Sequence, residues 1–404
     1  MPTDQQGFRG LTSSGPPRAP ALGRRSVLGT GLLGLLAACS GDGGTTNPSA
    51  SATKASATRP APLPTSDWSI RWATWPEYID VDDAGKRPSL AAFTKATSIS
   101  VSYDEVVEDN EEYVATIRDK LTAGQDVGAD ALTLTSWMCA ALARAGWLQP
   151  YGPVSHADAL LPALAAPDWD PDQTLSMPWQ AGLTGIAYDA RKVGRAIGSV
   201  NELFTRADLK GKVGLLTEFS DTMGMALLAQ GRPVATASPA DATAAVAFLA
   251  EQRASGQATK YYGNDYLDAL GSGEIVASMA WSGDILQAQG ENPYLKFVVP
   301  EEGLMIWADN IVVPTGSKQG AAVAALVDYY YQPAVAAQVA AWVNFICPVV
   351  GAQEELDKLD PDLASSPLIF PDASILDQSY QFPSFAADED ARLRTAFADL
   401  TKGG

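Results

Sequence analysis

Residues 69–103 read SIRWATWPEYIDVDDAGKRPSLAAFTKATSISVSY, and this segment identifies the class of fold. Ser69–Thr74 and Ile99–Tyr103 are rich in β-branched and aromatic residues, which predicts a strand at each end. Between them a Pro-Ser pair opens a predicted helix over Ser89–Thr97. A strand, a helix and a second strand in this order predict a βαβ unit and therefore a parallel sheet.

The same alternation continues along the chain. Further strands are predicted at Ala131–Leu134, Gly185–Tyr188, Val213–Leu216, Ile275–Met279, Phe297–Val299 and Asn310–Val313. Further helices are predicted at Glu111–Ala123, Ala240–Arg253, Gln319–Tyr331 and Pro333–Val343. The predicted fold class is therefore α/β, with parallel-rich sheets covered by helices on both faces.

The beginning of the chain has the pattern of an export signal. Two arginines at 24 and 25 precede an apolar run over residues 27–38, which suits a signal-peptide core and is too short to span a bilayer. The run ends in Leu36-Ala37-Ala38-Cys39, which resembles a bacterial lipobox. We therefore expect residues 1–38 to be a signal peptide and Cys39 to carry a lipid anchor. A soluble secretory signal is the alternative, and the paired arginines leave the twin-arginine and general export routes both open.

Composition and charge narrow the class of protein. Residues 39–66 are rich in Gly, Ser, Thr, Ala and Pro and are expected to form a disordered tether. The whole chain of 404 residues is 46% hydrophobic, which suffices for two compact lobes. Its formal net charge of −19 disfavours nucleic-acid binding, because no basic patch stands out in the sequence. Such a charge attracts cations, although many secreted proteins are acidic only for solubility.

Catalytic motifs are scarce. The chain has one histidine, His156, without a Gly-x-Ser-x-Gly elbow, and one histidine cannot build a multi-histidine zinc site. No phosphate-binding glycine motif appears, so no nucleotide or other cofactor is expected. Adjacent acids at Glu301-Glu302 and at 388–390 are more typical of a solvated face than of a glycosidase. We expect a protein that is not an enzyme, with a secreted hydrolase as the alternative.

Two further cysteines, Cys139 and Cys347, lie in apolar stretches. Outside the cell they can form a disulfide, but a buried free thiol is the favoured interpretation because cysteine packs as a small hydrophobe.

Acids lie beside aromatic residues at five separated places. These are Trp75-Pro76-Glu77-Tyr78, Ser136-Trp137, Glu218 with Asp221, Trp281-Ser282-Gly283-Asp284, and Trp307-Ala308-Asp309. Most of them follow or end a predicted strand, and strand ends in open α/β sheets face the ligand crevice. Carboxylates bind ammonium groups, while Trp and Tyr rings contact methylenes and attract cations. The five places are therefore expected to form a site for a small organic cation, unless the rings are core and the acids surface.

At these residues the chain resembles the polyamine-binding proteins of bacterial ABC importers, the spermidine and putrescine receptors. The likeness runs from Trp72 to Gln381. Its motifs are Trp75-x-Glu77-Tyr78, Thr135-Ser136-Trp137, Leu216-Thr217-Glu218-Phe219-Ser220-Asp221, Met279-Ala280-Trp281-Ser282-Gly283 and Ile306-Trp307-Ala308-Asp309. The resemblance implies a ligand site made of Trp75, Glu77, Tyr78, Thr135, Trp137, Glu218, Asp221, Trp281, Trp307, Asp309, Phe345 and Gln381. In this site Trp281 and Trp307 would form the walls and Asp309 would bind an amine.

The resemblance also implies the architecture and the partners. The expected fold is a two-lobed, type II periplasmic-binding-protein-like fold with the ligand cleft between the lobes. Lobe 1 would comprise residues 67–186 and 308–353, and lobe 2 residues 187–307 and 354–404. A monomer anchored through Cys39 on the extracellular or periplasmic side of the membrane would deliver a polyamine to permease and ATPase subunits.

Three departures from the family pattern leave the ligand open. Pro76 lacks a hydroxyl and a backbone N–H, and Trp137 and Phe345 stand where the family has tyrosines. A receptor of the same fold for thiamine, ferric iron or an amino-acid-like cation is therefore the alternative. Adjacent tyrosines at 261–262 and 329–331 would suit iron, although the second group falls in a predicted helix.

Overall fold

The computed structural model describes residues 68–402, so the predicted signal peptide, Cys39 and nearly all of the predicted tether lie outside the described residues. The strands are β1 (Ser69–Thr74), β2 (Ser100–Glu105), β3 (Ala131–Thr135), β4 (Ser176–Asp189), β5 (Val213–Leu216), β6 (Ala258–Tyr262), β7 (Ala277–Trp281), β8 (Leu295–Val298), β9 (Leu304–Val312) and β10 (Ser379–Tyr380).

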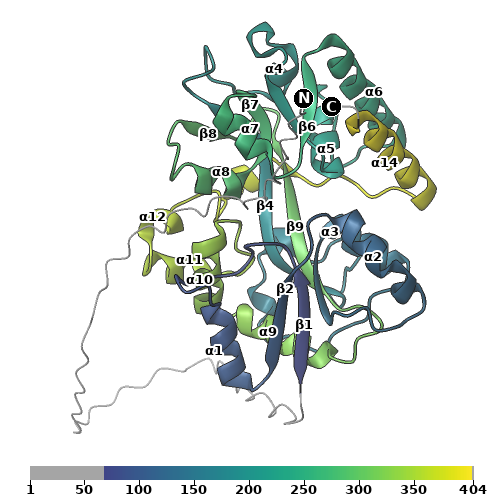
Figure 1. Ribbon diagram of the computed structural model, residues 1–404, viewed down its shortest axis with the longest axis vertical. Coiled ribbons are helices and arrows are strands. Elements are labelled where there is room, and N and C mark those ends of the chain that lie inside the picture. The colour runs from purple at the N-terminus through teal and green to yellow at the C-terminus, as the bar shows by residue number, and fades with distance from the viewer. Residues whose placement is uncertain (1–67, 403–404) are drawn as a thin grey trace, which may run out of the picture. The chain divides into compact units, whose positions relative to one another are not determined.

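The helices alternate with the strands over much of the chain, and α9 to α13 follow one another between β9 and β10 (Figure 1). They are α1 (Pro88–Thr97), α2 (Asn110–Thr122), α3 (Ser136–Arg144), α4 (Val200–Thr205), α5 (Phe219–Ala229), α6 (Pro239–Ser255), α7 (Tyr266–Ser272), α8 (Ser282–Ala288), α9 (Gly320–Tyr330), α10 (Pro333–Val343), α11 (Ala352–Asp357), α12 (Pro361–Ala364), α13 (Ala373–Leu376) and α14 (Ala387–Thr401). The predicted α/β class is confirmed.

The strands form a mixed sheet in the order β2-β1-β3-β9-β4-β7-β5-β6, with β10 beside β9 and β8 beside β4. β1 and β2 pair in parallel with α1 between them in sequence, which confirms the predicted βαβ unit. β4 and β9 run antiparallel to each other and to their other main partners. The prediction of a parallel-rich sheet is therefore only partly right, because the strand pair at its centre is antiparallel.

β4 and β9 are much longer than predicted. All 14 residues of β4 are buried, so the alternation of apolar and polar residues that signals a strand is missing. The register between β4 and β9 shifts between Pro178 and Gln180, a β-bulge opposite Asp309 and Asn310. Figure 1 shows the two long strands side by side. The sheet continues with β3, β1 and β2 on the side of β9 and with β7, β5 and β6 on the side of β4.

The buried hydrophobic side chains form three clusters that fall into two groups. Two clusters lie on the two faces of β1 and β3, and one lies around β5 and β7. Alternate residues of β1 and β3 point to opposite faces, so that Trp72 and Ala131 lie in one cluster while Ala73 and Leu132 lie in another. A separate core is built by α5, α6, β5 and β7. Two groups of cores joined by β4 and β9 are what a two-lobed protein requires.

The last part of the chain contributes to both groups. Leu356, Ala364 and Ile369, from a segment that the sequence assigned to the second lobe, pack in the core of the first strands. Leu393 and Phe397 of α14 pack in the core of α5 and α6. The lobe boundaries themselves stay predictions.

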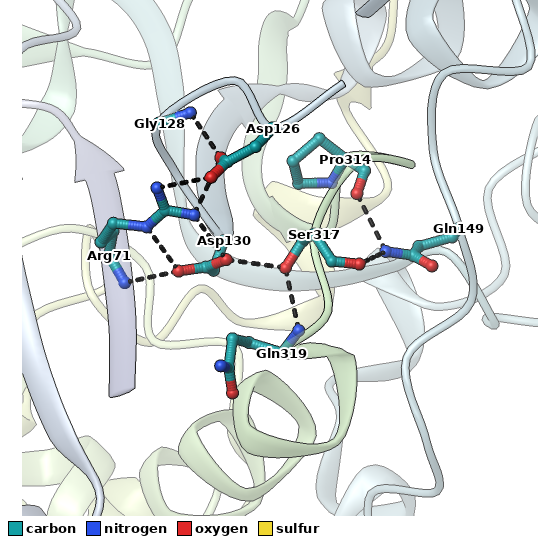
Figure 2. Close-up of polar contacts among 8 residues, drawn as sticks. All are labelled: Arg71, Asp126, Gly128, Asp130, Gln149, Pro314, Ser317 and Gln319. Carbon is teal, nitrogen blue, oxygen red and sulfur yellow. Dashed lines mark hydrogen bonds and ion pairs between the residues drawn. The ribbon is translucent and has the colours of Figure 1, made fainter. Parts of the chain in front are cut away.

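A network of hydrogen bonds connects β1 and the residue before β3 with the segment between β9 and α9 (Figure 2). Asp130 accepts from Arg71 Nε and Nη2, both at 2.9 Å, and from the Ser317 hydroxyl at 2.8 Å. Gln149 Nε2 donates to the carbonyls of Pro314 and Ser317. Asp130 is 3% exposed, and the Arg71 guanidinium helps to hold its pKa below the ordinary value despite burial. This buried carboxylate thus has a fixed cationic partner.

Candidate functional site

Asp309 is the centre of the predicted site. Its place on β9 is opposite Thr135 of β3, and its side chain is 6% exposed. The carboxylate accepts from the Tyr78 hydroxyl at 2.7 Å and from the Thr135 hydroxyl at 2.7 Å. Burial raises the pKa of Asp309 to about 6, although the two hydroxyl groups favour the charged form. The structure therefore brings together three sequence-predicted residues around one buried carboxylate.

Asp221 is a second buried carboxylate. It lies in the first turn of α5 and accepts from the Thr184 hydroxyl at 2.6 Å and from Trp281 Nε1 at 2.9 Å. Glu218, the N-cap of this helix, accepts from the Asp221 backbone N–H at 2.7 Å. Burial raises the pKa of both groups, and the two carboxylates disfavour each other's ionisation. The charge of Asp221 also raises the pKa of Asp309, so the two carboxylates act on each other.

Asp284 is a third acid, which the predicted site residues omit. It lies in the first turn of α8 and accepts from the Tyr266 hydroxyl at 2.9 Å. Burial raises the pKa of Asp284 to about 6, and its charge adds to the rise in the pKa of Tyr78. The signal for it was available, because the sequence Trp281-Ser282-Gly283-Asp284 is one of the places where an acid lies beside an aromatic residue.

Aromatic rings lie beside these carboxylates. The Trp307 ring lies against Gly182 of β4, where a Cβ atom would come within 2.2 Å of the ring. The Phe345 ring has its centroid 5.3 Å from that of Trp307 and 6.0 Å from that of Tyr78, both edge-on. Phe345 also leaves no room for a side chain at Gly283. The two glycines allow the rings to approach the backbone, so the walls of the site are tightly packed.

Three tryptophans among the predicted site residues have an indole nitrogen without a partner in the described part of the chain. Nε1 of Trp75, Trp137 and Trp307 is buried, and none of them has a hydrogen-bond partner among residues 68–402. Glu218 Oε1 is also buried and has no hydrogen-bond partner among these residues. Buried polar atoms are nearly always hydrogen-bonded in folded proteins, so either a water molecule or a bound solute is needed to complete the hydrogen bonding of these atoms.

Two predicted residues lie away from this cluster. The Glu77 side chain is exposed, the residue has φ of 55°, and its backbone N–H donates to Glu105. Gln381 is exposed directly after β10. Trp137 is half-buried, with the Arg394 guanidinium over its ring. The roles in binding of Glu77, Gln381 and Trp137, like those of the other predicted site residues, stay predictions.

Other kinds of site find little support. In the described part of the chain, no group of three or more His, Cys, Asp or Glu side chains is placed to hold a metal ion. His156 pairs with Asp328 at 3.0 Å, and Tyr330 and Tyr331 are buried in a core rather than presented as ligands. Cys139 and Cys347 are buried free thiols, which confirms the favoured interpretation, and burial raises the pKa of both. None of the helices between residues 68 and 402 has the length and hydropathy needed to cross a membrane.

Comparison with known proteins identifies the family. A profile of bacterial extracellular solute-binding proteins matches residues 89–371. Spermidine/putrescine-binding periplasmic protein 1 of Haemophilus influenzae is 27% identical over 315 residues, which cover 76% of this chain and 82% of that protein. The putrescine/agmatine-binding protein of Pseudomonas aeruginosa is 27% identical over 326 residues, covering 75% of this chain and 83% of that protein.

A solved structure gives independent evidence on the fold. The spermidine/putrescine ABC transporter substrate-binding protein PotD of Streptococcus pneumoniae matches with a TM-score of 0.69 at 20% identity, covering 83% of this chain and 99% of that one. This likeness confirms the predicted two-lobed, periplasmic-binding-protein-like fold. Because the family profile spans well over half of its residues, the chain belongs to the bacterial extracellular solute-binding proteins.

Proposed function

We propose that this protein binds a polyamine outside the cytoplasm and delivers it to the membrane subunits of an ABC importer. One observation carries the choice of solute: Asp221, Asp284 and Asp309 are shielded carboxylates without a cationic partner. In the region 68–402, no lysine, arginine or histidine forms an ion pair with any of the three. A buried carboxylate that lacks a counter-ion is costly, and a cationic solute would supply it.

The aromatic rings fit the rest of such a solute. An alkylammonium chain has charged ends and an apolar middle, so it needs carboxylates at its ends and flat apolar walls between them. Asp309 lies two residues from Trp307 on one strand, and Asp221 bonds the indole of Trp281. Relatives named as spermidine/putrescine-binding and putrescine/agmatine-binding proteins support the same class of solute.

Export and membrane attachment complete the proposal. The protein would be secreted, remain attached through a lipid on Cys39, and act as a monomer whose lobes close on the solute. The closed form would be the one that the permease and ATPase complex recognises. The protein itself would perform no chemical reaction on the solute.

Calorimetric titration with putrescine, spermidine, thiamine and ferric citrate tests the choice of solute. We expect at least one of the two polyamines to bind, and thiamine and ferric citrate to give no heat. Asp309→Asn should weaken that binding about tenfold or more, since the amine loses its charged partner. Asp130→Asn is the matched control, because it removes an equally buried carboxylate that already has Arg71 as partner. Equal affinity of wild type and Asp309→Asn, or no binding of either polyamine, would contradict the proposal.

A further inference from the structure

Arg394 of α14 contacts both lobes. Its neighbours Leu393 and Phe397 are buried in the core of α5 and α6, which fixes the helix on the second lobe. From there the guanidinium carbon lies 3.9 Å from the centroid of the Trp137 ring on α3 and 4.5 Å from that of Phe219 on α5. The side chain is 18% exposed. An arginine between two aromatic faces is held by cation–π attraction on each side.

Acidic groups fix the guanidinium in this place. Arg394 Nε donates to Asp390 one turn earlier in the helix at 2.8 Å, and Nη1 lies 3.6 Å from a carboxylate oxygen of Glu111 on α2. Two planar contacts and two carboxylates restrict the orientation of the side chain more than a single surface ion pair does. The positive charge is therefore a fixed part of the structure at this point.

This point lies at one end of the candidate site. Trp137 follows Thr135, which donates to Asp309, by two residues. Phe219 follows Glu218, the residue whose carboxylate binds the Asp221 backbone N–H and whose Oε1 has no partner among the described residues. The Arg394 charge also lowers the pKa of Glu218, so the two groups act on each other. Arg394 thus partly compensates the negative charge at this end, whereas Asp221, Asp284 and Asp309 have no such cation.

We propose that Arg394 determines specificity by closing the Trp137–Glu218 end of the site against a further ammonium group. The inference rests on the proposed function and names its substrate class more narrowly. An additional ammonium placed between Trp137 and Glu218 would lie beside a fixed like charge and would find its aromatic faces already occupied. A short diamine that uses the other carboxylates meets no such obstacle. The site therefore prefers putrescine to the longer triamine spermidine.

The test is the ratio of the putrescine and spermidine dissociation constants, measured by calorimetry on the full protein. Arg394→Met keeps an unbranched apolar side chain in place of the arginine stem and removes the charge, so we expect spermidine to gain about tenfold or more relative to putrescine. Arg394→Lys retains the positive charge and should keep most of the wild-type preference. A wild type that prefers spermidine, or an Arg394→Met variant with an unchanged ratio, overturns the inference.

Two control variants separate this effect from general changes in charge or helix docking. Arg191→Met removes a guanidinium that also lies over an aromatic ring, 4.3 Å from the Tyr294 centroid. Arg253→Met removes the contact of α6 with the Leu400 carbonyl, which helps to hold α14. Both should leave the ratio unchanged. If Arg253→Met shifts it as Arg394→Met does, docking of α14 is responsible and the specificity role fails. A wild type that binds neither polyamine is instead a failure of the proposed function.

Discussion

At the scale of single residues, two aspartates with similar burial have opposite surroundings. Asp130 is 3% exposed and is paired with Arg71, while Asp309 is 6% exposed and accepts only from neutral hydroxyl groups. The pKa of Asp130 is lowered and that of Asp309 is raised to about 6. The charge of Asp130 therefore stabilises the folded protein. The charge of Asp309 has no cationic partner within the fold and does not stabilise it.

We expect the substitution of each aspartate by asparagine to have opposite effects on the free energy of unfolding of the solute-free protein. A carboxyl group with a raised pKa binds more protons in the folded state, so its stability contribution falls as pH rises from about 4 to about 6. Asp309→Asn cannot ionise and so avoids this loss of stability, and its free energy of unfolding should exceed that of wild type at pH 7.5. The pKa of Asp130 is lowered, so its contribution is present above the ordinary value of 3.8, and Asp130→Asn should be destabilised at pH 7.5 by about 1–3 kcal/mol.

Urea unfolding of the three proteins between pH 4.5 and 7.5 measures both effects. The difference between Asp309→Asn and wild type should shrink as pH falls below about 6. A difference that does not change with pH would mean that Asp309 is not the group that titrates.

At the scale of elements, the register of β4 and β9 positions the site. Gly182 pairs with Trp307, and Gln180 pairs with Asp309 beyond the bulge at Trp179. Trp179 is buried and its Nε1 donates to the Tyr78 carbonyl at 3.0 Å, which holds the loop after β1 near Asp309. The bulge thus links the strand pair to the tyrosine that bonds the central carboxylate.

Gly182→Ala tests whether β4 supports the Trp307 wall. The new Cβ would lie 2.2 Å from the ring in its present position, so the ring has to move while the hydrogen bonds of the strand pair remain possible. We expect solute affinity to fall about tenfold, with a change in indole fluorescence on binding. Gly271→Ala is the control, because a Cβ there meets nothing within 4 Å. A Gly182→Ala variant with wild-type affinity would show that Trp307 is not a wall of the site.

The elements also show what the sequence could and could not predict. β1, β5 and α10 have the predicted bounds because their composition and periodicity are local properties. β4 was predicted as only its last part, since a fully buried strand with Pro178 and Gly182 has no alternation to detect. The acids at 388–390, predicted as a solvated face, are the first turn of α14, where negative charge is favourable.

For the candidate site, contacts between residues of recognisable motifs could be predicted from the sequence, and contacts with distant residues could not. Tyr78, Thr135 and Asp309 were predicted by resemblance, and the structure places them in direct contact. Arg394 gave no signal, because its contact with Trp137 depends on how α14 packs and not on any local pattern.

At the scale of the whole molecule, the lipid anchor is a separate prediction, and it depends on residues outside the described range. Cys39→Ala should shift the exported protein from the detergent phase to the aqueous phase in a Triton X-114 partition, because the acylation site is lost. Solute affinity should stay the same, since Cys39 is not among the residues of the candidate site, all of which lie within residues 68–402. Cys347→Ala is the matched control, because it removes a buried free thiol and leaves the lipobox intact. Equal partitioning of wild type and Cys39→Ala would refute lipid anchoring.

The central strand β9 also sets the distance between two side chains of the candidate site. Trp307 and Asp309 are alternate residues of β9 and so point to the same face, roughly 6.8 Å apart along the strand. A slip of one residue against β4 would turn both side chains to the opposite face, so the hydrogen-bonded register keeps them on this face, while the extended backbone of β9 sets the distance between them. In the proposed complex, the distance between an ammonium group on Asp309 and the Trp307 ring would therefore be set by the backbone of β9. A change of specificity within this scaffold would therefore have to arise at the ends of the site, where loops and α14 contribute. The distance between Trp307 and Asp309 at its centre would stay the same.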